Sequence, residues 1–229
     1  MIFRGFQTLS MVDYPGHICA TVFTAGCNMR CPYCHNPDLV LNKDHLPTFS
    51  EEEIFEFLDS RKGKLDGVCI TGGEPTIHKG LKAFIKKVKE RGFKVKLDSN
   101  GSNPAFLESV IDEGLVDFIA MDVKELPENY PEKLSATYKP EDIEKSIVLL
   151  KENRVPYEFR LTAVPEVTDA DAIRAIAKQV KGAEKFCLQQ FIPANNMFDT
   201  SISKTFSHEE LTSLGESIKD HVKHVEIRA

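Results

Sequence analysis

The sequence has no apolar run long enough to cross a membrane and no excess of basic residues. None of its hydrophobic stretches reaches the ~18 residues that a membrane-spanning helix needs. Residues 1–6 lack the long apolar core of a signal peptide. The formal net charge is −6, which argues against a nucleic acid or an anionic membrane surface as a partner. We therefore expect a cytoplasmic protein.

The sequence also lacks a second group of closely spaced cysteines. Three of its six cysteines, Cys27, Cys31 and Cys34, form the pattern C-x3-C-x2-C. In a chain that is not exported, such a group indicates metal binding or catalysis before disulfides. The other three lie singly in apolar runs, where we expect buried free thiols: Cys19, Cys69 and Cys187.

Three thiolates without a fourth narrow the choice of metal. A structural zinc ion usually has four protein ligands. His35 could be the fourth, but it directly follows Cys34, and adjacent side chains rarely reach one tetrahedral ion. An electron-transfer [4Fe–4S] centre also takes four cysteines. The pattern therefore favours a cluster with one open iron over a zinc site or a non-enzymatic iron–sulfur electron carrier.

Strand-like apolar runs alternate with amphipathic helical patterns along the chain. The expected strands are Ile18–Thr24, Gly67–Thr71, Lys94–Leu97, Val116–Asp122, Tyr157–Val164 and Lys185–Ile192. The expected helices have apolar faces around Ile54–Leu58, Leu81–Val88, Leu107–Ile111, Ile143–Leu150, Ile173–Val180 and Leu211–Val222. Ser50 and Glu53 form a capping-box pattern. Such repetition predicts an α/β fold with parallel strands and right-handed crossovers.

Six strand–helix units are fewer than the eight of a closed barrel. They leave either a partial barrel or a doubly wound sheet. No low-complexity linker interrupts the pattern, so we expect one domain over residues 1–229, with a cysteine loop at 26–37 and a final helix and short strand at 207–229. Residues 125–140, with three prolines, are expected to form a long loop.

Polar residues recur where the predicted strands end. They are the cysteine loop, Gly72-Gly73-Glu74-Pro75, Asp98-Ser99-Asn100-Gly101, Asp122-Val123-Lys124, Arg160 with Thr162, and Gln189 with Gln190. Functional side chains gather at the carboxyl ends of parallel strands. Two glycines let the backbone approach a ligand, and their carbonyls can accept from an ammonium group. The simpler alternatives are a strand-to-helix turn at Gly72-Gly73 and a buried ion pair at Asp122.

The cysteine loop and the Gly-Gly-Glu-Pro segment together resemble the radical S-adenosylmethionine (SAM) superfamily. The resemblance implies a partial (β/α)6 TIM-like barrel. It implies a [4Fe–4S] cluster on Cys27, Cys31 and Cys34, through which these cysteines act in catalysis, with SAM on the open iron. The other residues that it implies at the cofactors are Tyr33, His35, Gly72, Gly73, Glu74, Asp98, Ser99, Asn100, Asp122, Lys124, Arg160 and Gln190.

Two of these segments resemble glycyl-radical-enzyme activases. The Asp98-Ser99-Asn100-Gly101 segment is similar to their Asp-Thr-Asn-Gly, which implies SAM contact and a monovalent cation beside Asp98. Asp122-Val123-Lys124 is similar to their Asp-Leu-Lys. Arg160 would contact a SAM carboxylate or ribose, unless it only pairs with Asp122 or Asp98. Gln190 stands near the place of a histidine in pyruvate formate-lyase activases.

The segments Leu9–Gly16 and Cys34-His35-Asn36-Pro37 resemble the activating proteins of anaerobic ribonucleoside-triphosphate reductase. This resemblance implies that flavodoxin or ferredoxin supplies an electron, that SAM is cleaved to a 5′-deoxyadenosyl radical, and that this radical removes a hydrogen from a glycine of the partner enzyme. A small-molecule or peptide-modifying radical SAM enzyme, similar to 7-carboxy-7-deazaguanine synthase, is the alternative. In that family Asp-Thr typically follows the third cysteine.

Overall fold

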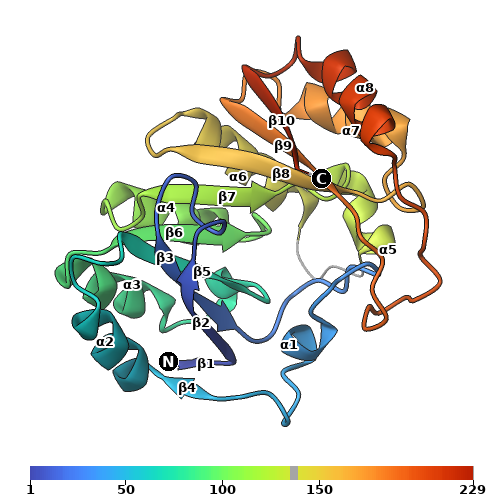
Figure 1. The fold of residues 1–229 in the computed structure, drawn as a ribbon. Coiled ribbons are helices and arrows are strands. Elements are labelled where there is room, and N and C mark those ends of the chain that lie inside the picture. The colour runs from blue at the N-terminus through green and yellow to red at the C-terminus, as the bar shows by residue number, and fades with distance from the viewer. Residues whose placement is uncertain (135–138, 229) are drawn as a thin grey trace. The chain divides into compact units, whose positions relative to one another are not determined.

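The computed structural model describes residues 1–134 and 139–228. Its contacts divide the chain into two compact units. The first unit comprises Met1–Cys27, Asp38–Ser99 and Ala105–Ile119, and the second comprises Asn28–Pro37, Asn100–Pro104 and Ala120–Ala229. Helices and strands alternate through most of the chain (Figure 1). The single domain expected over residues 1–229 stays a prediction.

The first unit is built on four strands in the order β6-β5-β3-β2. They are β2 (Gly5–Ser10), β3 (Cys19–Thr24), β5 (Gly67–Gly72) and β6 (Lys94–Ser99). The last three pair in parallel, and β2 pairs with β3 in the antiparallel sense. A short antiparallel pair joins β1 (Ile2–Phe3) to β4 (Phe49–Ser50). The near-continuous burial of β3 and β5 is typical of parallel strands covered on both faces.

The three longer helices of the first unit lie where the sequence periodicity predicted them. Four elements lie wholly or mostly in this unit beside the η1 turn (Pro75–Ile77): α1 (Pro37–Leu41), α2 (Glu51–Ser60), α3 (Leu81–Glu90) and α4 (Pro104–Asp112). The predicted capping box is confirmed, because Ser50 and Glu53 each accept a hydrogen bond from the other's backbone N–H. Helix α2 buries Phe55 and leaves Phe57 half-buried, where it packs against Phe6.

The second unit contains three parallel strands in the order β8-β9-β10. They are β8 (Tyr157–Ala163), β9 (Lys185–Gln190) and β10 (His224–Arg228). Its helices are α5 (Tyr130–Lys133), α6 (Pro140–Lys151), α7 (Ala170–Gln179) and α8 (His208–Ile218). Helix α8 packs against α7 and against strands β9 and β10 (Figure 1). Strand β7 (Phe118–Asp122) begins in the first unit and ends in the second.

All six predicted strands form, as β3 and β5 to β9, and the predicted C-terminal strand forms as β10. The periodicity missed β1, β2, β4 and α1, which are short or carry exposed residues. The structure corrects the prediction of a long loop at residues 125–140. This segment holds the turn η2 (Pro127–Asn129) and helix α5, where proline at the first helical positions presets the backbone. Residues 135–138 of that segment lie outside the described residues.

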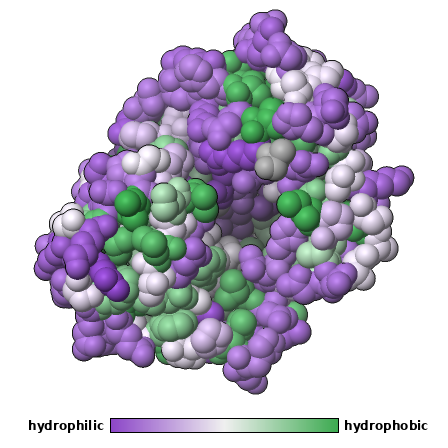
Figure 2. Space-filling view, in the orientation of Figure 1, coloured by the Kyte–Doolittle hydropathy of each residue, from purple (hydrophilic) through white to green (hydrophobic). Residues whose placement is uncertain are grey.

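No helix in the described part of the chain is long and apolar enough to cross a membrane. The face in Figure 2 is mostly hydrophilic, with hydrophobic side chains in separate patches. Among the exposed large hydrophobic residues, Met11 and Val12 are 73% and 85% accessible. They follow strand β2 directly.

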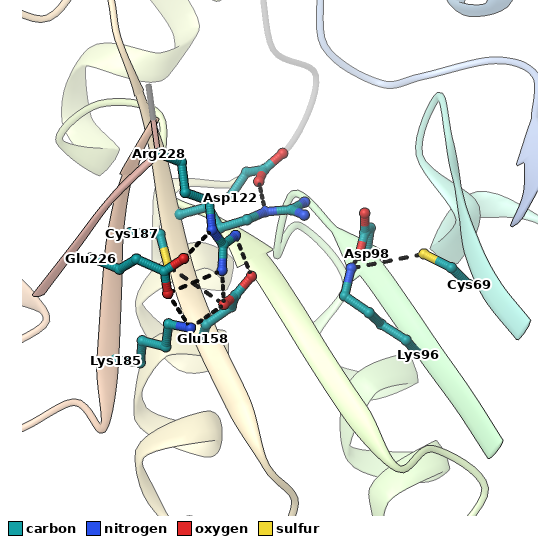
Figure 3. A network of polar contacts seen from close by, with 10 residues as sticks. Cys69, Lys96, Asp98, Asp122, Glu158, Lys185, Cys187, Glu226 and Arg228 are labelled. Atoms are coloured by element: carbon teal, nitrogen blue, oxygen red, sulfur yellow. Dashed lines mark hydrogen bonds and ion pairs between the residues drawn. The ribbon is translucent and has the colours of Figure 1, made fainter. Parts of the chain in front are cut away.

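A buried carboxylate connects the three strands of the second unit (Figure 3). Glu158 on β8 is 1% exposed and accepts hydrogen bonds of 2.9 and 2.7 Å from Arg228 on β10. Lys185 and the Cys187 thiol on β9 lie 3.4 Å from its Oε2. Burial raises the pKa of Glu158, but the hydrogen bonds and charge of Arg228 outweigh it and hold that pKa at about 2. This ion pair attaches the C-terminal strand.

Replacing Arg228 by methionine should lower the free energy of unfolding by about 3–5 kcal/mol, because it leaves the Glu158 charge buried without its main partner. The folded pKa of Glu158 lies below its ordinary 4.5. Its contribution is therefore present above pH ~4.5 and is lost as the pH falls towards 2. Denaturant unfolding between pH 7 and pH 3 measures both effects.

Lys223→Met is the matched control, since Lys223 is 60% exposed in its pair with Glu184 and should change stability little. Equal losses in the Arg228 and Lys223 variants would contradict the buried pair as the attachment of β10.

Candidate active site

The three cysteines of the loop are divided between the two units. Cys27 ends a segment of the first unit, and Cys31 and Cys34 belong to the second. Cys31 is buried, whereas Cys27 and Cys34 are partly accessible. Among the described residues, no three His, Cys, Asp or Glu side chains stand ready as a metal-ligand group. That the three thiols bind a cluster therefore stays a prediction, which is based on their spacing in the sequence.

His35 anchors the cysteine loop within the second unit. Its ring stacks on Phe191, with the ring centres 5.7 Å apart, and its Nε2 lies 2.8 Å from the carbonyl oxygen of Ile192. Against a carbonyl, that nitrogen must carry the proton. Asn196 in turn donates to the carbonyl of His35 at 3.0 Å. His35 was predicted at the cofactors, and that role stays a prediction. Its contacts hold the residue next to Cys34 in place.

Asn100 connects the cysteine loop to the segment Asn100–Pro104. Its Nδ2 donates to Oδ1 of Asn28 at 2.9 Å, and its Oδ1 accepts from the backbone of Ser102 at 3.0 Å. Asn28 also donates to the Ser102 hydroxyl at 2.8 Å. The sequence singled out Asn100 but missed Asn28 and Ser102. No local pattern could have found them, because Asn28 lies 72 residues from Asn100.

Tyr33 carries a buried hydroxyl that has no hydrogen-bond partner within the described residues. Its side chain packs edge-on against Phe191. Burial first, and then the neighbouring Cys31 thiol, raise the pKa of Tyr33 well above its ordinary value. The phenol therefore stays protonated and presents an O–H donor. A buried donor without an acceptor is costly, so this hydroxyl is suited to a bound ligand.

Asp122, Lys124 and Arg160 form the charged group of the second unit. Asp122 accepts from Lys124 at 3.0 Å and from the Arg160 Nε at 2.8 Å. Burial raises the pKa of Asp122, but the two cations outweigh it and hold that pKa below its ordinary value. Burial lowers the pKa of Lys124, and Asp122 more than reverses this. The predicted alternative of an ion pair is present, and a SAM contact by any of the three stays a prediction.

The Gly72-Gly73-Glu74 segment makes a tight junction in the first unit. The Glu74 amide donates to the carbonyl of Gly26 at 2.8 Å, and a Cβ on Gly73 would lie 1.9 Å from that oxygen. Only glycine fits at that position. Glu74 is 1% exposed and accepts from Ser99 at 2.9 Å and from both the amide and the hydroxyl of Thr76. Glu74 and Ser99 thus join the ends of β5 and β6.

Two further predicted residues have structural partners. Asp98 on β6 pairs with the ammonium of Lys96, which is 2% exposed. Gln190 at the end of β9 donates to the carbonyl of Phe206 at 3.0 Å. This contact connects β9 to the segment before α8. A direct SAM contact by Asp98 or Gln190 is an untested prediction.

The sequence model of the radical SAM superfamily matches residues 21–178. A protein of Methanocaldococcus jannaschii, provisionally named a glycyl-radical enzyme activating enzyme, is 38% identical over 98% of this chain and 94% of its own length. A pyruvate formate-lyase-activating enzyme of Streptococcus mutans is 28% identical over 83% of this chain and 76% of its own length. The fold also matches the crystal structure of Streptococcus suis SuiB bound to S-adenosylmethionine, with a TM-score of 0.69 and 14% sequence identity. This match covers 89% of the present chain and 48% of the SuiB chain.

The chain belongs to the radical SAM superfamily. Within that superfamily it is an enzyme of the glycyl-radical activase type, as its relatives indicate. Its mostly parallel α/β fold is shared with solved radical SAM enzymes and is consistent with the predicted partial barrel. Enzymes of this family use a [4Fe–4S] cluster and SAM. The three closely spaced cysteines of the loop fit these cofactors, and so does the buried Tyr33 hydroxyl, which has no partner within the described residues.

Gly73→Ala should destabilise the protein by about 1–3 kcal/mol, because its Cβ would overlap the Gly26 carbonyl and force the junction apart. Thermal unfolding of the cluster-free protein checks this. Gly80→Ala is the matched control, since a Cβ there meets Met1 at an ordinary 3.6 Å. Equal stability of the two variants would show that the junction tolerates a side chain.

His35→Leu should keep all three thiols yet hold the cluster less firmly, since the loop loses its hydrogen bond to Ile192 and its ring stack on Phe191. After anaerobic reconstitution, we expect iron to be lost to a chelator several-fold faster than from the wild type. His208→Leu, on an exposed turn of α8, should behave like the wild type. Unchanged iron release in His35→Leu would argue against the anchoring role.

Proposed function

We propose that this enzyme generates a glycyl radical on anaerobic ribonucleotide reductase. The observation that carries the activase part is the C-x3-C-x2-C loop in a chain that matches an activating enzyme over nearly its whole length. The Leu9–Gly16 segment and the Cys34-His35-Asn36-Pro37 segment support the choice of partner, because both resemble activating proteins of that reductase. We further propose a cytoplasmic location and flavodoxin or ferredoxin as the electron donor.

The Leu9–Gly16 segment comprises the last two residues of β2 and most of the connection from β2 to β3 in the first unit. Tyr14 is buried in one cluster with Cys19 and Cys69, and Asp13 accepts a 2.6 Å hydrogen bond from Thr21. These residues hold the connection in place. Met11 and Val12 remain largely exposed on it. If this segment distinguishes the partner enzyme, its exposed hydrophobic side chains Leu9, Met11 and Val12 are available to touch it.

In the proposed mechanism, Cys27, Cys31 and Cys34 hold the cluster and leave one iron for SAM. When bound, the cluster would pass one electron from the donor to SAM, whose cleavage to methionine would supply a 5′-deoxyadenosyl radical able to take a Cα hydrogen from the partner's glycine. The chain's own residues orient the reactants. Tyr33 offers a proton donor inside the second unit, and Lys124 and Arg160 offer positive charge that Asp122 fixes in place. Glu74, which Ser99 and Thr76 hold, fixes the glycine carbonyls beside it.

The anaerobically reconstituted protein should convert SAM to 5′-deoxyadenosine when dithionite is added, and Cys31→Ala should abolish this conversion. Chromatography of the quenched reaction measures the product. Cys187→Ala is the control, because Cys187 is a buried thiol on β9 and should be dispensable for the cluster. Absence of 5′-deoxyadenosine from a protein with a complete cluster would exclude the proposed chemistry.

Electron paramagnetic resonance of the reductase, mixed with this enzyme, SAM and a reductant, tests the partner. A glycyl radical doublet should appear with the wild type and not with Cys31→Ala. SAM cleavage without a glycyl signal on the reductase would reject it as the partner. If every co-encoded glycyl radical enzyme also stayed silent, a small-molecule or peptide substrate would be favoured.

A further inference from the structure

A lysine is buried inside a strand of the first unit (Figure 3). Lys96 on β6 is 2% exposed, although lysine is almost never fully buried unless it is paired. Alternate residues of a strand share a face, so Lys96 and Asp98 lie on the same side of β6. The Lys96 ammonium pairs with Oδ1 of Asp98, which is itself 14% exposed. The positive charge of Lys96 is therefore compensated by an ion pair with Asp98.

The Cys69 thiol beside Lys96 does not compete with Asp98 for the ammonium charge. The Cys69 thiol on β5 lies 3.8 Å from the ammonium, and the two residues are register partners. Burial above all raises the pKa of Cys69 well above its ordinary value, so the thiol is neutral. Asp98 therefore compensates the buried ammonium by a direct ion pair. An ion pair of this kind persists because either charge left alone would be strongly disfavoured.

The pair changes what Asp98 can bind. The resemblance to activases led us to expect a monovalent cation on this carboxylate. A metal cation there would lie only a few ångströms from the ammonium, and two positive charges at that separation repel strongly in a poorly hydrated site. The residues present therefore do not fit a metal cation at Asp98. They fit a carboxylate whose neutralising charge is already part of the chain.

We propose that the Lys96 ammonium replaces the monovalent cation at Asp98, so that this enzyme binds and cleaves SAM without one. The proposal rests on the proposed function in so far as Asp98 contributes to the SAM site. Lys96 is then a positioning residue that acts through Asp98. The Lys96 ammonium takes the place that a sodium or potassium ion would have beside the Asp98 carboxylate.

Thermal unfolding of the cluster-free protein tests the proposal without any need for activity. The wild type, Lys96→Met and Lys94→Met are compared in NaCl, KCl and choline chloride at equal ionic strength. Lys94 is the matched control, because it is an exposed lysine of the same strand. We expect equal melting temperatures in the three salts for the wild type and Lys94→Met. The melting temperature of Lys96→Met in choline chloride should be below that of the wild type. Na⁺ or K⁺ should raise it saturably, because a cation that binds only the folded state stabilises that state.

A saturable rise of the wild-type melting temperature with Na⁺ or K⁺ would overturn the proposal, and so would a Lys96→Met variant that responds alike to all three salts. If Lys96→Met does not fold, Lys96→Arg replaces it. That variant keeps a fixed positive charge, so its melting temperature should be the same in the three salts. A selective response of Lys96→Arg to Na⁺ or K⁺ would count against the proposal.

SAM cleavage by the reconstituted enzyme gives the second readout. The wild-type rate should not change when choline replaces Na⁺ and K⁺. In choline chloride, the SAM cleavage rate of Lys96→Met should be at least ten-fold below that of the wild type. NaCl or KCl should raise the rate of this variant at least five-fold. A wild type that cleaves SAM only with a metal cation would refute the role of Lys96. A wild type that cleaves no SAM in any salt would refute the proposed function instead, and the melting temperatures would still decide the role of Lys96.

Discussion

Charges buried inside strands need a partner, and this requirement organises both units. In the first unit, Lys96 pairs with Asp98 two positions along the same strand. In the second, Glu158 on β8 is 1% exposed and pairs with Arg228 on β10. An unpaired charge at any of these positions would cost several kcal/mol. Among the described residues, Lys96 and Glu158 are therefore buried as members of ion pairs, which fix the orientation of both side chains.

The loops that carry the cofactor residues depend on a second kind of support. His35 holds the cysteine loop by stacking on Phe191, and Asn100 holds it through Asn28. These contacts satisfy the polar groups of a loop that would otherwise be free to move. Tyr33 differs, since its buried hydroxyl has no partner within the described residues. A loop held by such contacts and carrying a buried donor suits ligand binding, because less binding energy is spent on ordering the loop.

A shared motif does not by itself determine shared ion chemistry. The Asp98-Ser99-Asn100-Gly101 segment resembles a stretch that implies a metal cation in related activases. Here the residue two positions before Asp98 is a lysine, and its ammonium occupies the same electrostatic role. The relevant difference lies outside the motif, on a strand position that looks like an ordinary part of a lysine-rich segment. Buried lysines next to functional carboxylates can thus change an enzyme's ion requirement without changing its fold.

The local sequence determined the strand–helix alternation, the capping box at Ser50 and the C-x3-C-x2-C loop, because each depends on residues a few positions apart. The sequence also indicated that the backbone at Gly73 closely approaches another group. The group that requires a glycine there is the Gly26 carbonyl, which lies 47 residues away in the chain. The tertiary structure alone decided that Phe191 supports His35, that Arg228 neutralises Glu158 and that Lys96 is buried. These contacts join residues that are distant in sequence or depend on which face of a strand is covered. Periodicity predicts where a side chain points, whereas its partner is chosen by packing between elements that the sequence does not place next to each other.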